Sequence, residues 1–140
     1  MAHFLNDLTE RKCLTVSPDT PIERVVSTLS SNSIGALVVK TERGNVDGII
    51  SERDIVHSLA EKKSIDGLVV DDIMTRKVVY IEPNYSSTEI MKIMTEKKLR
   101  HLPIISENNL IGIVSIGDVV QHLIKKYQSE AEQMRSFILQ

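Results

Sequence analysis

Short apolar runs alternate with amphipathic helical patterns along this chain of 140 residues. Four runs of mostly apolar residues are typical of buried strands, and within each pair a polar turn joins one strand to the next. A pattern with helical spacing follows each strand pair. The predicted strands are residues 36–39, 47–51, 102–105 and 110–115, the turns are 43–45 and 107–109, and the helices are 52–62 and 116–126.

A further strand and helix are predicted ahead of each strand pair. The first strand ends near Val16 and its counterpart near Ile81. Thr20 can cap the first helix, with Pro21 in its first turn and Glu23 completing a capping box, and Ser86 and Glu89 repeat this arrangement in the second unit. The order strand, helix, strand, strand, helix therefore occurs twice. The residues that the two helices are expected to bury are Ile22, Val25, Val26, Leu29, Ile90, Ile93 and Met94.

The two units are copies of each other. Residues 48–59 align with residues 112–123, and six of the twelve positions are identical. We place the copies at residues 8–63 and 72–127. Because a unit near 60 residues buries too little surface alone, we expect the copies to share one hydrophobic core.

Residues 128–140 are predicted to continue as a C-terminal helix. Ala131, Met134, Ile138 and Phe137 lie toward one side of it. We expect this side to cover the chain's own core, and the alternative is contact with a second chain. Because the helices at 52–62 and 116–126 carry apolar residues on more than one face, we also expect a homodimer.

Charge and composition narrow the range of possible partners and activities. The net charge is −2 and basic residues alternate with acidic ones, a pattern that argues against a nucleic-acid partner. The single cysteine, Cys13, excludes an internal disulfide and favours a reducing compartment, for which we expect the cytoplasm. Residues 1–7 lack the pattern of a signal peptide, and no apolar run could span a membrane, so no membrane partner is expected. The four histidines have no metal-ligand spacing, and no serine sits in a nucleophile elbow, so neither a metal nor an enzymatic activity is predicted.

Both copies carry Gly-apolar-apolar-Ser-x-x-Asp where a strand gives way to a helix. The carboxylates of Asp118 and Asp54 could each accept both vicinal hydroxyls of a ribose. The hydroxyls of Ser115 and Ser51 lie at a helix N-terminus, which favours a phosphate, and Arg53 adds a possible phosphate contact. The alternative is that Ser and Asp only cap the helix.

The copies differ where the second apolar run begins. Arg100 and His101 stand where the first copy has Gly35 and Ala36, which concentrates positive charge for a phosphate on this side. The alternative is a solvated cation at a helix C-terminus and a half-buried strand residue. Val78, at the start of the second-copy strand, is predicted to line a base pocket.

Three features together resemble a pair of cystathionine-β-synthase (CBS) domains, from about residue 14 to 123. They are the doubled order of elements, the doubled Gly-apolar-apolar-Ser-x-x-Asp motif, and the segments Asp71-Asp72-Ile73-Met74-Thr75 and Arg100-His101-Leu102-Pro103. The resemblance implies an α+β fold in which two β-α-β-β-α repeats pack sheet to sheet about a pseudo-twofold axis, the arrangement called a Bateman module. It also implies two clefts for adenine nucleotides.

The resemblance further implies a function. Backbone groups of Leu102 and Pro103 would contact the base, and the ligand would be AMP, with ATP and NAD as the next candidates. Such modules often form homodimers and regulate other proteins, so an unidentified regulated protein is expected as a partner. The alternative is a structural dimerisation module whose clefts stay empty.

Overall fold

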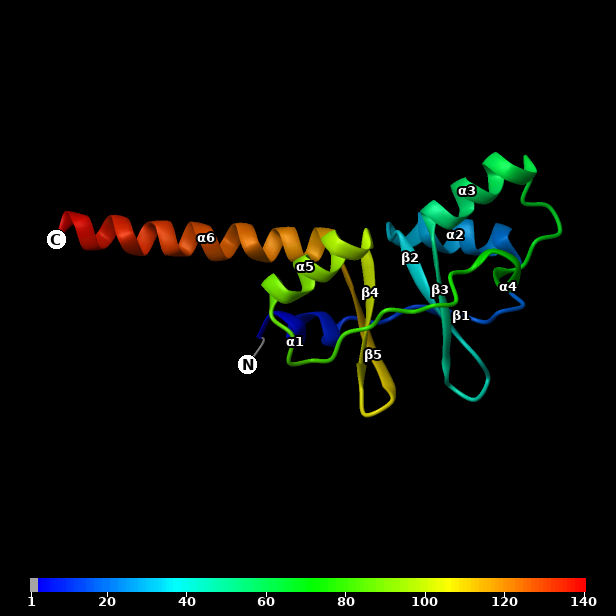
Figure 1. The fold of residues 1–140 in the computed structure, drawn as a ribbon, viewed down its shortest axis with the longest axis horizontal. Coiled ribbons are helices and arrows are strands. Elements are labelled where there is room, and N and C mark those ends of the chain that lie inside the picture. The colour runs from blue at the N-terminus through cyan, green and yellow to red at the C-terminus, as the bar shows by residue number, and fades with distance from the viewer. Residues whose placement is uncertain (1–2) are drawn as a thin grey trace.

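The computed structural model describes residues 3–140. Met1 and Ala2, part of the N-terminal segment considered above, lie outside the described residues. Figure 1 shows two α+β halves side by side, with one long helix projecting from the second half. The elements are α1 (His3–Glu10), β1 (Thr15–Val16), α2 (Ile22–Asn32), β2 (Ala36–Lys40), β3 (Val46–Ser51), α3 (Glu52–Lys62), α4 (Val70–Ile73), α5 (Ser87–Lys97), β4 (His101–Ser106), β5 (Asn109–Ser115) and α6 (Ile116–Leu139).

The predicted strand pairs are confirmed as antiparallel hairpins with matching registers. Ala36 pairs with Ser51 between β2 and β3, and His101 pairs with Ser115 between β4 and β5. Each serine therefore ends its strand opposite the first residue of the neighbouring strand. This register places the two Ser-x-x-Asp motifs at equivalent positions in the two halves.

The first strand is confirmed in the first repeat, where it ends at Val16, but not in the second repeat. In the first half β1 has two residues, and it pairs in parallel with β2. In the second half its counterpart is a single bridge from Ile81 to Ile104, held by hydrogen bonds from the Ile81 N–H to Pro103 and from the Ile105 N–H to Ile81. The strand predicted to begin near Val78 is thus wrong, and that half has a two-stranded sheet.

The hydrophobic core is divided, contrary to the single shared core that was expected. One cluster of buried side chains lies in the first half, around Leu37 and Ile50, and another in the second half, around Leu102 and Ile104. Val38 is fully buried as well, but alternation along a strand turns it to the face opposite Leu37. We attribute its burial to the second sheet, which lies beside the first (Figure 1).

Short helices that the sequence did not predict connect the two cores. Helix α1 precedes the first repeat, yet its Leu5 and Leu8 are buried in the cluster of the second half, where α1 packs on β5. Helix α4 precedes the second repeat, and its Val70, with Met74 just after it, is buried in the cluster of the first half. Each repeat is therefore completed by the segment that leads into the other one, which explains how two small cores remain together.

Two details of the predicted helices differ at α2. Its N-cap is Pro21, without a side-chain cap, and the capping box from Thr20 is not formed. The Ile22 N–H instead donates to the carbonyl of Leu68, so the segment before α4 satisfies this end of the helix. Val26 is 39% exposed because it lies at the edge of the buried stripe.

Most of the corresponding predictions for α5 are confirmed. The side chain of Ser86 accepts from the Glu89 N–H at 3.1 Å, which confirms Ser86 as the cap. The return hydrogen bond from the Ser86 N–H to the Glu89 side chain is not formed, so the predicted capping box is wrong in this half. Ile90 and Met94 are buried, and Ile93 packs against the same cluster while remaining partly exposed.

Helix α6 does not fold back over the core. The helices predicted at 116–126 and 128–140 form one continuous helix of 24 residues, and every residue from Ile124 onward is exposed. Figure 1 shows its C-terminal part extending away from the body. The expectation that this segment covers the chain's own core is therefore wrong.

Candidate functional site

Both Ser-x-x-Asp motifs form reciprocal capping boxes at a helix N-terminus. At α6 the Ser115 N–H donates to Asp118 Oδ2 at 2.8 Å, and the Asp118 N–H donates to Ser115 Oγ at 3.1 Å. At α3 the Ser51 N–H donates to Asp54 Oδ2 at 2.9 Å, and the Asp54 N–H donates to Ser51 Oγ at 3.3 Å. Each aspartate thus lies in the first turn as predicted, while its Oδ2 serves the backbone.

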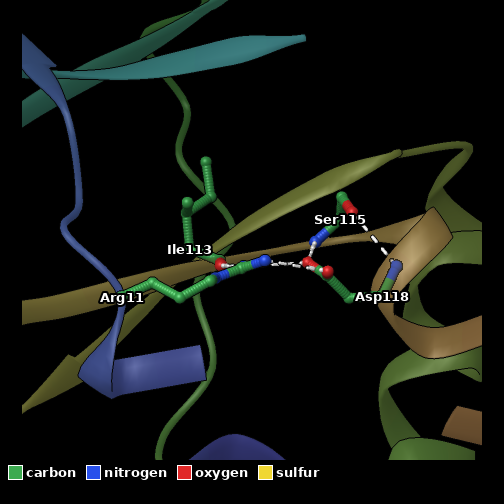
Figure 2. A network of polar contacts seen from close by, with 4 residues as sticks. All are labelled: Arg11, Ile113, Ser115 and Asp118. Atoms are coloured by element: carbon green, nitrogen blue, oxygen red, sulfur yellow. Dashed lines mark hydrogen bonds and ion pairs between the residues drawn. The ribbon is translucent and has the colours of Figure 1, made fainter. Parts of the chain in front are cut away.

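The carboxylate of Asp118 is not free, contrary to the expectation from sequence. Arg11 Nη1 donates to Oδ1 and Arg11 Nη2 to Oδ2, both at 3.0 Å, and Nη2 also donates to the carbonyl of Ile113 (Figure 2). Planar guanidinium and carboxylate groups matched in this way form one of the stronger hydrogen-bonded pairs. A ribose at this carboxylate has to compete with Arg11.

Asp54 has a weaker partner at the equivalent position. Thr75 Oγ1 donates to Asp54 Oδ1 at 3.1 Å. The spacing from Arg11 to Thr75 is 64 residues, the same as from Asp54 to Asp118. Each aspartate is therefore contacted by a residue shortly after the short helix that leads into the other repeat. That residue is the charged Arg11 after α1 in one half and the neutral Thr75 after α4 in the other.

Sequence reasoning missed both of these contacts. Thr75 lay within the quoted lead-in segment, so repeat comparison could have marked it. Arg11 carried no such signal, because the repeat has Thr at that position and the contact spans 107 residues.

The partners of Asp118 also set its charge. Burial by itself would raise the pKa of this carboxyl group, but the hydrogen bonds from Arg11 and Ser115 and the positive charge of Arg11 outweigh burial. The pKa of Asp118 therefore lies below its usual value of 3.8. At neutral pH the group is an anion, the form needed to accept hydroxyl donors.

A cavity of about 710 Å³ opens beside Asp118, between the two halves. Its lining combines the Ser115 to Asp118 turn with the segments 33–36 and 11–14. Three cations reach it, Arg11, Lys12 and Arg100, against two carboxylates, Asp118 and Glu52. A negatively charged ligand is therefore favoured.

A smaller cavity of about 130 Å³ lies beside Asp54. It is lined by the other predicted residues of this half, Ser51 and Arg53, and by Thr75. Arg53 Nη1 donates to the carbonyl of Lys98 at 3.2 Å, which links the halves at this point. A further cavity, of about 320 Å³, is also lined by Arg53 and Asp54.

Arg100 and His101 line both cavities, so they lie between the two motifs and belong to neither alone. A Cβ on Gly35 would come within 3.1 Å of the His101 ring, which shows how closely the halves approach here. Burial, followed by the charge of Arg100, lowers the pKa of His101, and Glu52 and Asp118 offset this only in part. The ring is neutral at neutral pH.

The predicted base-binding residues do not line either cavity. Leu102 is fully buried in the second core, and the carbonyl of Pro103 accepts the Ile81 N–H. Val78 is half-buried outside the strands. Contact of these residues with a base stays a prediction.

Within residues 3–140, no cluster of three histidine, cysteine or acidic residues could hold a metal ion. No helix in that range has the length and apolar character needed to cross a membrane.

Comparison with known proteins places both repeats in one family. The family described as "CBS domain" matches residues 5–61 and 70–125. The chain is 32% identical over 130 residues to the mitochondrial CBS domain-containing protein CBSX3 of Arabidopsis thaliana, a match covering 89% of this chain and 63% of that protein.

Solved structures share the fold. A CBS-domain containing protein from Agrobacterium tumefaciens is 37% identical with a TM-score of 0.81, over 87% of this chain and 98% of that one. A CBS domain pair in complex with 5′-methylthioadenosine and S-adenosyl-L-methionine is 22% identical with a TM-score of 0.80, over 90% and 99% of the two chains. The two-half α+β architecture is thereby confirmed.

Proposed function

Because this chain belongs to the CBS domain family, in which pairs of repeats act as regulatory modules, we propose that it senses an adenine nucleotide and modulates a partner protein. We propose AMP as the ligand, with ATP and NAD as the next candidates. In this role the module binds its ligand without catalysing a reaction. Its output depends on the partner or on the geometry of a homodimer.

The observation that carries the proposal is the cavity of about 710 Å³ beside the N-terminus of α6. It offers an ionised carboxylate, Asp118, for ribose hydroxyls, and cations for phosphate. A cavity of this size falls within the range of small-molecule sites. The methylthioadenosine complex described above supports the choice of an adenosine-type ligand at the level of the fold alone.

A melting experiment tests the proposal directly. A ligand at 100 times its dissociation constant adds about 2.7 kcal/mol to the free energy of unfolding, which for this size should raise the melting temperature by roughly 5 to 10 °C. Unchanged melting with AMP, ATP and NAD at millimolar concentration would contradict the proposal.

The alternative, a structural dimerisation module with empty clefts, is favoured by one observation: both aspartates already have partners. The same melting experiment separates the two functions. A cytoplasmic location remains a proposal, and one relative is named as mitochondrial.

A further inference from the structure

The exposed side of α6 carries a regular apolar pattern that no part of residues 3–140 covers. Six residues follow one another at spacings of four, three, four, three and four, which is the heptad spacing of a coiled-coil seam. Their exposure shows that the seam is uncovered. They are Val120 (41% exposed), Ile124 (53%), Tyr127 (57%), Ala131 (exposed), Met134 (66%) and Ile138 (76%).

The seam is distinct from the side of α6 that packs on the body. Val119 is fully buried and Leu123 packs against the same core cluster. These two residues each lie one position from the seam, about 100° around the helix. The side facing the body and the seam can therefore be occupied at the same time.

Within residues 3–140, no segment covers the distal half of α6, residues 124–139. Every residue from Ile124 to the end of the helix is exposed, and most of the stability of a helix in a protein comes from tertiary packing of its apolar face. A partner along the seam supplies such contacts. Figure 1 shows this half extending clear of the body, where a second helix has room to lie alongside.

We propose that this seam pairs in parallel and in register with the seam of a second copy of this chain. The charges beside the seam favour this occupant and this direction. In a parallel pair, Glu130 lies just before the seam residue Ala131 and faces Arg135 of the other copy, which is five residues further along the sequence. By symmetry, two such contacts between opposite charges form. In the antiparallel alignment that keeps all six seam positions paired, two Glu130 side chains would meet near the centre.

This inference deepens the homodimer part of the proposed function by assigning the contact to α6, and it does not depend on nucleotide binding. Its first test is reversal of the flanking charges. Glu130→Arg alone and Arg135→Glu alone each place like charges opposite one another and should weaken self-association by roughly 5- to 30-fold. The double variant should recover the affinity of the unchanged chain. Sedimentation equilibrium measures all four proteins.

The second test removes the seam. Met134→Asp with Ile138→Asp places charges within the apolar contact and should weaken association by at least roughly 100-fold. Gln133→Asp with Ser136→Asp adds the same charge on the polar side of the same helix and should leave association unchanged. A dimer that survives the seam variant, or an unchanged chain that sediments as a 15.7 kDa monomer at micromolar concentration, would overturn the inference.

The direction of pairing is tested by cross-linking in a Cys13→Ser background. Met134→Cys should link to itself through a short bis-maleimide, whereas Gln133→Cys should not. Linkage of Met134→Cys to Ile124→Cys in a mixture, without self-linkage, would mean antiparallel pairing and overturn the inference. Nucleotide-induced melting shifts should be the same in all seam variants, so a missing shift would count against the proposed function and not against the seam.

Discussion

Arg11 and Asp118, which are 107 residues apart in the sequence, make a two-point contact in which each terminal guanidinium nitrogen donates to one carboxylate oxygen at 3.0 Å. The equivalent contact in the other half is a single hydrogen bond from Thr75 to Asp54. The two motifs are therefore alike in sequence and cap geometry but differ in how firmly the carboxylate is held. Ligand binding at Asp118 requires Arg11 to move or to share its partner.

We expect Arg11→Thr, which copies the other half, to strengthen AMP binding by up to about 5-fold. A partly exposed ion pair contributes up to about 1 kcal/mol, and removing it frees the carboxylate for the ribose. Titration calorimetry measures the change. Lys12→Thr is the control, since Lys12 lines the same cavity without a contact to Asp118, and it should weaken binding. Weaker binding in Arg11→Thr would show that Arg11 holds the phosphate instead.

Ribose recognition predicts discrimination against deoxyribose. If an aspartate accepts both hydroxyls, 2′-deoxy-AMP should bind about 10 to 100 times more weakly than AMP, because hydrogen bonds to charged groups contribute about 1.5 to 3 kcal/mol each. Asp118→Ala should erase this difference if the larger cavity is occupied, and Asp54→Ala should do so if the smaller one is. Equal affinities for the two nucleotides in the unchanged protein would reduce both aspartates to helix caps.

Stability should fall with acidification through the ordinary titration range of histidine. The pKa of His101 is lowered from 6.5 in the folded protein, so the unfolded chain binds a proton first as the pH falls. The free energy of unfolding should therefore decrease below about pH 6.5, by at most about 1.4 kcal/mol per pH unit for this one proton. Urea titrations from pH 7.5 to about pH 5 measure this effect.

The control for that effect is His101→Gln, in which this part of the decline should disappear. Asp118 contributes in a different window. Because its pKa is depressed, its stabilisation is present above the unfolded value and is lost only as the pH falls below about 3.8. A slope between pH 6.5 and 5 that is identical in His101→Gln would assign the decline to other groups.

The two motif glycines should differ in their tolerance of a methyl group. A Cβ on Gly48 would lie 2.7 Å from the carbonyl oxygen of Thr75, whereas a Cβ on Gly112 would meet no atom closer than 3.4 Å. We expect Gly48→Ala to lower the free energy of unfolding by about 1 to 3 kcal/mol through overpacking. Gly112→Ala should cost less than about 1 kcal/mol. Chemical denaturation compares the pair, and equal losses would contradict the close approach of Thr75.

Local patterns in the sequence determined most of the secondary structure. Helix α3 begins and ends where its pattern predicts, and the strand pairs lie within one residue of their predicted bounds. The repeat predicted that Ser51 and Ser115 occupy equivalent places. These features depend on near neighbours, which is why periodicity, turn residues and caps suffice to find them.

Contacts between distant segments were decided only by the tertiary structure. Helix α1 packs on the second half, and Thr20 gives up its cap because the carbonyl of Leu68 reaches the end of α2. Arg11 reaches Asp118 because that same packing of α1 carries it across from the first repeat to the second. A side chain's partner across 107 residues depends on where the backbone brings it, and no local pattern encodes that. The sequence therefore located both motifs, and only the packing of α1 decided which carboxylate is held by a cation.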